Sequence, residues 1–99
     1  MLNKDKGVVK MNNYSYPIDV AWTTNETIAV VEFLQKIESA YEKGIAVEDL
    51  QSAYKEFKKV VKSIGEEKRL GADFEKESGY SIYRTIQEMK STTRKIVKM

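Results

Sequence analysis

Residues 23–44 read TTNETIAVVEFLQKIESAYEKG, and this stretch decides the fold class. Its apolar residues recur at the spacing of an α-helix with one buried face; they are Ile28, Val31, Leu34 or Phe33, Ile37, Ala40 and Tyr41. Thr23 and Glu26 make a capping box, with Thr24 as the competing N-cap. Gly44 stands where a left-handed residue ends a helix. We therefore expect a helix from about Thr24 to Lys43, which is about 30 Å long at 1.5 Å per residue.

A second helix is predicted over about Val47–Ser63. Acidic residues lie in its first turn and lysines in its last turn, as the helix dipole prefers. Its apolar stripe is Leu50, Ala53, Tyr54, Phe57, Val60, Val61 and Ile64. Because the link of residues 44–46 is short, we expect the first two helices to be antiparallel neighbours.

Two further helices are predicted in the second half of the chain. One covers about Gly65–Ser78, with Ser63 and Glu66 as a second capping box. The other covers about Ile82–Val97, with Ser81 as its N-cap. The inner face of this last helix is expected to hold Ile82, Tyr83, Ile86, Met89, Thr93, Ile96 and Val97. No clear strand alternation occurs, so the prediction is an all-α fold.

An aromatic strap, residues 12–22, precedes the first helix. Pro17 favours an extended backbone at the residue before it. The large apolar side chains of the strap are Tyr14, Tyr16, Ile18 and Trp22. They predict either a lid that packs on one end of the bundle or an aromatic binding patch. Residues 1–11 are expected to be a flexible arm, with Met11 as an alternative natural start, and residues 12–99 a single helical domain.

The composition of the 99 residues removes several kinds of chemistry. The chain has no Cys and no His, which excludes thiolate sites, disulfides and the usual general base near neutral pH. A net charge of +2 is too small to indicate nucleic acid by itself. Neither a signal peptide nor an apolar run long enough for a membrane span is visible. We expect a cytoplasmic protein that needs no cofactor or metal.

Five aromatic residues are the candidates for a partner-binding surface, because such side chains are enriched at interface hot spots. They are Tyr14, Tyr16, Trp22, Tyr80 and Tyr83. The alternative is that Tyr80 and Tyr83 pack against Trp22 and the strap. In the turn that holds them, Gly79 supplies a positive φ angle and Ser81 caps the next helix, which explains both structurally.

Charged residues form two further clusters. The basic end carries Arg84, Lys90, Arg94, Lys95 and Lys98, and these residues either complement the helix dipole or bind an anionic partner. The acidic cluster holds Glu66, Glu67, Asp73, Glu75 and Glu77. Because Lys68, Arg69 and Lys76 are interleaved with it, a solvated charged face is favoured over a metal site, and a small metal-dependent hydrolase is the weakest function.

Four motifs together resemble a known family. They are YSYPID at residues 14–19 with WTT at 22–24, AYEKGI at 40–45, EEK at 66–68, and FEKESGYSIY at 74–83. The chain resembles uncharacterised protein family 0223, the YktA-like small bacterial proteins, over about residues 11–90. The resemblance implies a compact all-helical fold in the bacterial cytoplasm, with no assigned activity and no catalytic residues to transfer. The last nine residues are expected to match weakly.

The sequence thus predicts an all-α small bundle of three long helices and one shorter helix with an extended aromatic strap. The expected function is a non-enzymatic protein-interaction or regulatory module, with an unidentified protein partner and a homodimer as a further expectation. The alternative is an RNA- or ribosome-associated protein that uses the basic C-terminal helix. No membrane partner is expected.

Overall fold

The computed structural model describes residues 10–11 and 14–99. The expected arm of residues 1–11 therefore lies almost entirely outside the described residues. Within the described part the helices are α1 (Thr24–Glu42), α2 (Val47–Val60), α3 (Ile64–Ser78) and α4 (Ile82–Ser91). The strands, each of two residues, are β1 (Lys10–Met11), β2 (Tyr14–Ser15), β3 (Ile45–Ala46) and β4 (Ile96–Val97). The all-α class is confirmed.

Helices α1, α3 and α4 begin after residues whose side chains cap them, whereas α2 follows Ala46, which makes no side-chain cap. The Thr23 hydroxyl accepts a hydrogen bond from the Glu26 amide at 3.1 Å, and the Glu26 carboxylate accepts one from the Thr23 amide at 2.9 Å. Ser63 and Ser81 cap α3 and α4 through their hydroxyls. Gly44 and Gly79 have φ angles of +91° and +82° after α1 and α3, a conformation that costs glycine little.

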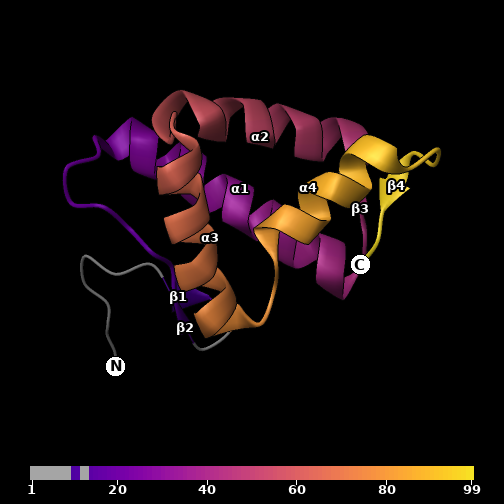
Figure 1. The fold of residues 1–99 in the computed structure, drawn as a ribbon, viewed down its shortest axis with the longest axis horizontal. Helices are drawn as coiled ribbons and strands as arrows, with labels where there is room; N and C mark the ends of the chain where they lie inside the picture. The colour runs from indigo at the N-terminus through magenta and orange to yellow at the C-terminus, as the bar shows by residue number, and fades with distance from the viewer. Residues whose placement is uncertain (1–9, 12–13) are drawn as a thin grey trace.

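The helices α1 and α2 form an antiparallel hairpin, and α3 and α4 cross it (Figure 1). Phe33 of α1 stacks on Phe57 of α2 with 4.3 Å between the ring centroids. Phe74 of α3 and Ile86 of α4 join the same buried cluster. Each helix therefore contributes apolar side chains to one core, but Ile28, Ile64 and Tyr83, which were expected on the buried stripes, are exposed.

The predicted extent of the last helix is wrong. Helix α4 ends at Ser91, and Ile96–Val97 forms β4, which pairs antiparallel with β3. The Val47 amide also donates to the Lys95 carbonyl at 2.8 Å, and the Met99 amide donates to the Ala40 carbonyl at 2.8 Å. The strand conformation buries Val97 completely. Pairing with β3 at the α1–α2 link therefore determines the conformation of Ile96 and Val97, although their spacing in the sequence also fits a helix.

A smaller correction concerns α2, which ends at Val60 rather than near Ser63. Val61 leaves helical geometry with a ψ angle of +86°, and its side chain is nevertheless buried. The chain can then turn within three residues into α3. No helix in the described ranges is long and apolar enough to cross a membrane.

Candidate interaction surface

A buried carboxylate on α1, Glu38, holds the N-terminal strap. It is 4% exposed and accepts hydrogen bonds from the hydroxyl of Tyr16 at 2.7 Å and from the hydroxyl of Tyr14. A charge in a protein interior needs such partners. Both tyrosine rings also lie against Phe74, with centroid separations of 6.2 and 6.1 Å. At these two positions the strap is packed as a lid over α1 and α3.

The environment of Tyr16 makes it a neutral hydrogen-bond donor. Burial raises the pKa of Tyr16 well above its ordinary value of 10, and the hydrogen bond to Glu38 raises it further. The side chain is 5% exposed. Tyr16 therefore offers almost no surface to a partner.

Tyr80 is held at the end of α1. Its ring stacks on that of Tyr41 with 4.5 Å between centroids and an interplanar angle of 11°. Its hydroxyl donates to Glu42 at 2.8 Å, and that hydrogen bond is the main cause that raises the pKa of Tyr80. The Tyr41 hydroxyl accepts from the Ser81 amide at 3.1 Å. These contacts fasten the α3–α4 turn to α1, and Tyr80 is half-buried by them.

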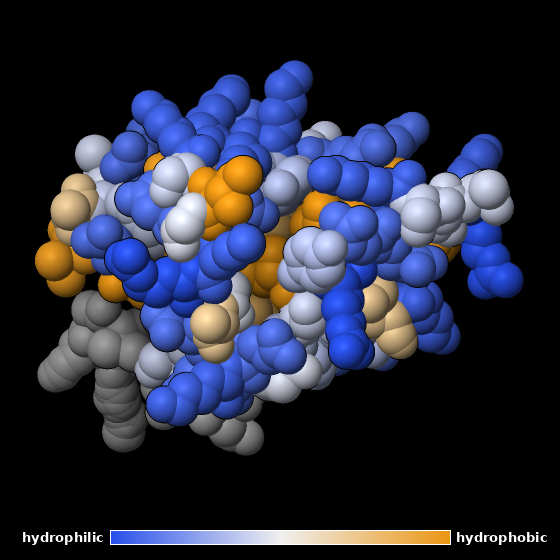
Figure 2. Space-filling view, in the orientation of Figure 1, coloured by the Kyte–Doolittle hydropathy of each residue, from blue (hydrophilic) through white to orange (hydrophobic). Residues whose placement is uncertain are grey.

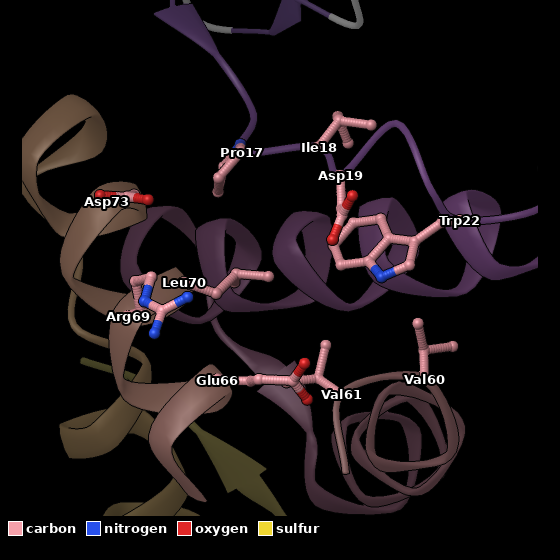
Figure 3. Close-up of a pocket in the computed structure, with 10 residues that line it drawn as sticks. All are labelled: Pro17, Ile18, Asp19, Trp22, Val60, Val61, Glu66, Arg69, Leu70 and Asp73. Carbon is pink, nitrogen blue, oxygen red and sulfur yellow. The ribbon is translucent and has the colours of Figure 1, made fainter. Parts of the chain in front are cut away.

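Trp22 lines a shallow cavity between the strap, the end of α2 and α3 (Figure 3). The cavity measures about 270 Å³, slightly below the roughly 300–1,000 Å³ typical of ligand pockets. In Figure 3 the indole lies beside Asp19 on the strap, whereas Arg69 and Asp73 project from α3 on the other side. The lining residues are Pro17, Ile18, Asp19, Trp22, Val60, Val61, Glu66, Arg69, Leu70 and Asp73.

A larger hollow, the α3–α4 groove, measures about 420 Å³. Its lining residues are Tyr54, Ile64, Glu67, Lys68, Gly71, Ala72, Glu75, Ser81, Ile82, Tyr83, Ile86, Gln87 and Lys90. Figure 2 shows this face, with apolar side chains in a hollow surrounded by hydrophilic ones. Ile82 and Ile86 are buried, whereas Tyr83 is 72% exposed and Ile64 is 68% exposed. Of the five predicted aromatic residues, Tyr83 is thus the one that presents its side chain to solvent at a groove.

The structure does not bring the five aromatic residues together on one surface. Tyr14 and Tyr16 meet at Glu38, whereas Tyr80 stacks on Tyr41. Trp22 and Tyr83 line two different hollows. The predicted surface is therefore divided between interior contacts, the cavity beside Trp22 and the α3–α4 groove.

The five basic residues of the C-terminal region are all exposed. Arg84 and Lys90 lie on α4, and the others follow it. In the part of the chain that the structure describes, none of the five forms an ion pair with a carboxylate. Of the five, only Lys90 lines the groove.

The acidic cluster is divided by its contacts. Glu67 accepts from the Lys58 ammonium at 2.6 Å and from the Tyr54 hydroxyl at 3.1 Å. Burial, together with the Glu67 carboxylate, raises the pKa of Tyr54 to about 12. Across the described ranges, no three acidic side chains converge in the manner of metal ligands. The contacts at Glu67 join α2 to α3.

Sequence reasoning missed Glu38 and Ile64 as residues of interest. Glu38 occupies the position four residues after Leu34 and three before Tyr41, which places a charge inside the apolar stripe of the first helix. That position is the signal that could have identified it. Ile64 was expected in the apolar stripe of the second helix, but it begins α3 and faces solvent.

The family model described as Uncharacterised protein family (UPF0223) matches residues 13–98. The chain belongs to this family. It is 56% identical over 86 residues to a UPF0223 protein of Listeria welshimeri, which covers 87% of this chain and 96% of the relative. A UPF0223 protein of Enterococcus faecalis is 51% identical over 80 residues, or 81% of this chain and 87% of the relative. One of Streptococcus sanguinis is 49% identical over 79 residues, or 80% and 86%.

Membership in UPF0223 confirms the resemblance carried by the strap and by the turn at residues 78–83. The family match extends through α4 and β4 to residue 98, which is further than the expected limit near residue 90. It therefore includes the α3–α4 groove and the C-terminal basic residues. The family description assigns no activity to the chain.

Proposed function

We propose that this protein is a non-enzymatic interaction or regulatory module that binds another protein through the α3–α4 groove. The observation that carries the proposal is the exposure of Tyr83 and Ile64 beside a groove whose floor is made by Ile82 and Ile86. Contiguous apolar surface with a polar rim is typical of protein-binding sites. An exposed tyrosine at such a site supplies a large contact area.

The chemistry of the chain supports recognition rather than catalysis. It has neither His nor Cys, so a general base near neutral pH would have to be a carboxylate with a raised pKa or a Lys or Tyr with a lowered pKa. The most buried carboxylate, that of Glu38, already accepts hydrogen bonds from two tyrosine hydroxyls. Both of those hydroxyls are used to hold the strap.

Photo-crosslinking tests this proposal directly. A photoreactive phenylalanine analogue at position 83 is expected to form a covalent adduct with a protein in living cells, because the side chain there faces the occupant. The adduct should disappear when Ile64→Glu is added, since a carboxylate at the rim of the groove opposes burial of an apolar partner.

The matched control places the same analogue at Val20, which is 99% exposed and does not line the groove. The proposal requires an adduct at position 83 that is absent at position 20 and sensitive to Ile64→Glu. Equal labelling at the two positions, or an adduct at position 83 that persists in the folded Ile64→Glu variant, would refute it.

The second candidate function is RNA or ribosome association through Arg84, Lys90, Arg94, Lys95 and Lys98. It is favoured by their exposure and by the absence of ion pairs to them within the described residues. Binding driven by phosphate contacts weakens steeply as salt rises. Retention on RNA at low salt that is lost at moderate salt would support this candidate, and no retention at low salt would eliminate it.

A further inference from the structure

The face of α3 that lines the groove has the spacing of a helix-pairing seam. Its residues lie at intervals of three and four along the helix; they are Ile64, Glu67, Lys68, Gly71, Ala72 and Glu75. This spacing is the one by which one helix packs along another. The helix therefore presents a second face, rotated by roughly a third of a turn from its core residues Leu70 and Phe74.

The centre of this seam holds two small residues, Gly71 and Ala72. Gly71 does not have the positive φ angle that Gly44 and Gly79 have. A Cβ atom added there would meet the Ile82 side chain at 3.9 Å, which is ordinary van der Waals contact. Packing within the chain thus does not require glycine at this position, although glycine in a helix is less stable than alanine. Ala72 beside it is exposed, and its short side chain projects little from the helix.

The charges on either side of Gly71 and Ala72 are arranged symmetrically. Lys68 lies three residues before Gly71, and Glu75 lies three residues after Ala72. Residues three or four positions away from Lys68 and Glu75 are uncharged, so neither has the usual ion-pair partner within its helix. Neither forms an ion pair elsewhere among the residues that the structure describes.

We propose that the occupant of the α3–α4 groove is a second copy of this chain, related by a two-fold axis that passes between Gly71 and Ala72. Antiparallel pairing about this axis sets Lys68 against Glu75 of the second copy, and Glu75 against Lys68 of the second copy. A two-fold interface must be self-complementary in this way. The same contact covers Ile64 and Tyr83 of both copies. This inference rests on the proposed function, because it names the protein that the groove binds.

Sedimentation velocity of the purified full chain over a broad concentration range tests the inference by charge reversal. The unaltered protein is expected to form a dimer. Glu75→Lys sets lysine against lysine twice and should weaken the dimer by about tenfold or more. Lys68→Glu should have an equivalent effect. The double variant Lys68→Glu/Glu75→Lys restores both pairs and should recover the dimer.

The matched control is Glu77→Lys, which makes the same charge change on an exposed residue of α3 that does not line the groove. It should leave dimerisation unchanged. Circular dichroism of each variant verifies that the helices remain formed. Tyr83→Ala should weaken the dimer without a charge change.

A monomer at every concentration would overturn the inference. So would a dimer that is insensitive to Glu75→Lys, or a double variant no better than the single ones. If the chain is monomeric but position 83 still crosslinks to a different protein in cells, the second-copy inference fails and the proposed function stands. If no groove-dependent crosslink is found either, both fail.

Discussion

At the residue scale, Glu38 determines where the N-terminal segment lies. Its carboxylate accepts from Tyr16, which precedes it by 22 residues, and from Tyr14. The donors can be seen in the sequence as aromatic residues beside a proline, but their acceptor is a single charge in an apolar stripe. Which glutamate they would meet depends on the path of the strap across α1 and α3, and no local pattern encodes that path.

Removing one tyrosine hydroxyl from the contact with Glu38 should lower the free energy of unfolding. Tyr16→Phe is expected to lower the free energy of unfolding by about 1.5–3 kcal/mol, because a buried carboxylate loses a hydrogen bond. Tyr83→Phe removes a hydroxyl from an exposed ring and should change it by no more than about 0.5 kcal/mol. Urea denaturation of the two variants measures the difference. A loss below about 0.5 kcal/mol for Tyr16→Phe would mean that the contact does not stabilise the strap.

Ionisation of Tyr54 is expected to lower the stability of the folded protein at high pH. Its pKa is raised from 10 to about 12 in the folded protein, so folding favours the protonated phenol. The stability that this group contributes is complete below pH 10 and is lost as the pH rises through about 12. Denaturation measured at intervals from pH 9 to pH 12 should show falling stability, with a shallower fall in Tyr54→Phe. An identical slope in that variant would contradict the assignment.

At the element scale, the sequence predicts starts of helices better than it predicts the end of the chain. Thr23, Ser63 and Ser81 mark helix starts, because each hydroxyl accepts a hydrogen bond from the amide three residues later. Such local signals can be recognised in the sequence alone. The end of α4 is different. Ile96 and Val97 continue the helical spacing, but they pair with β3, which lies about 50 residues earlier in the chain.

The β3–β4 pairing predicts that alanine substitutions at Ile96 and Val97 change the free energy of unfolding by different amounts. Val97 is fully buried, whereas Ile96 is about half exposed. Val97→Ala should therefore lower the free energy of unfolding by about 1.5–3 kcal/mol through lost burial and a residual cavity. Ile96→Ala should cost less than about 1 kcal/mol. If residues 92–97 were helical instead, this order would not be expected, and thermal or urea unfolding of the two variants decides between the two conformations.

At the scale of the whole molecule, four helices within the described residues enclose one core and leave the α3–α4 groove open. The amphipathic stripes were sufficient to predict the core. They did not predict the groove, because Ile64 reads as a continuation of the α2 stripe until the chain turns at Val61. The groove is created by the angle between α3 and α4, which is a property of the assembled fold.

Oxidative footprinting of the protein inside its own cells, compared with the dilute purified protein, tests whether the α3–α4 groove is occupied. Tyr83 is exposed at the groove, and Met99 is exposed next to the basic C-terminal residues. We expect Tyr83 to be oxidised much less in cells than in the dilute protein, and Met99 to be oxidised equally in both. Equal oxidation of Tyr83 in the two samples, or protection of Met99 alone, would contradict the claim that the α3–α4 groove is the binding surface.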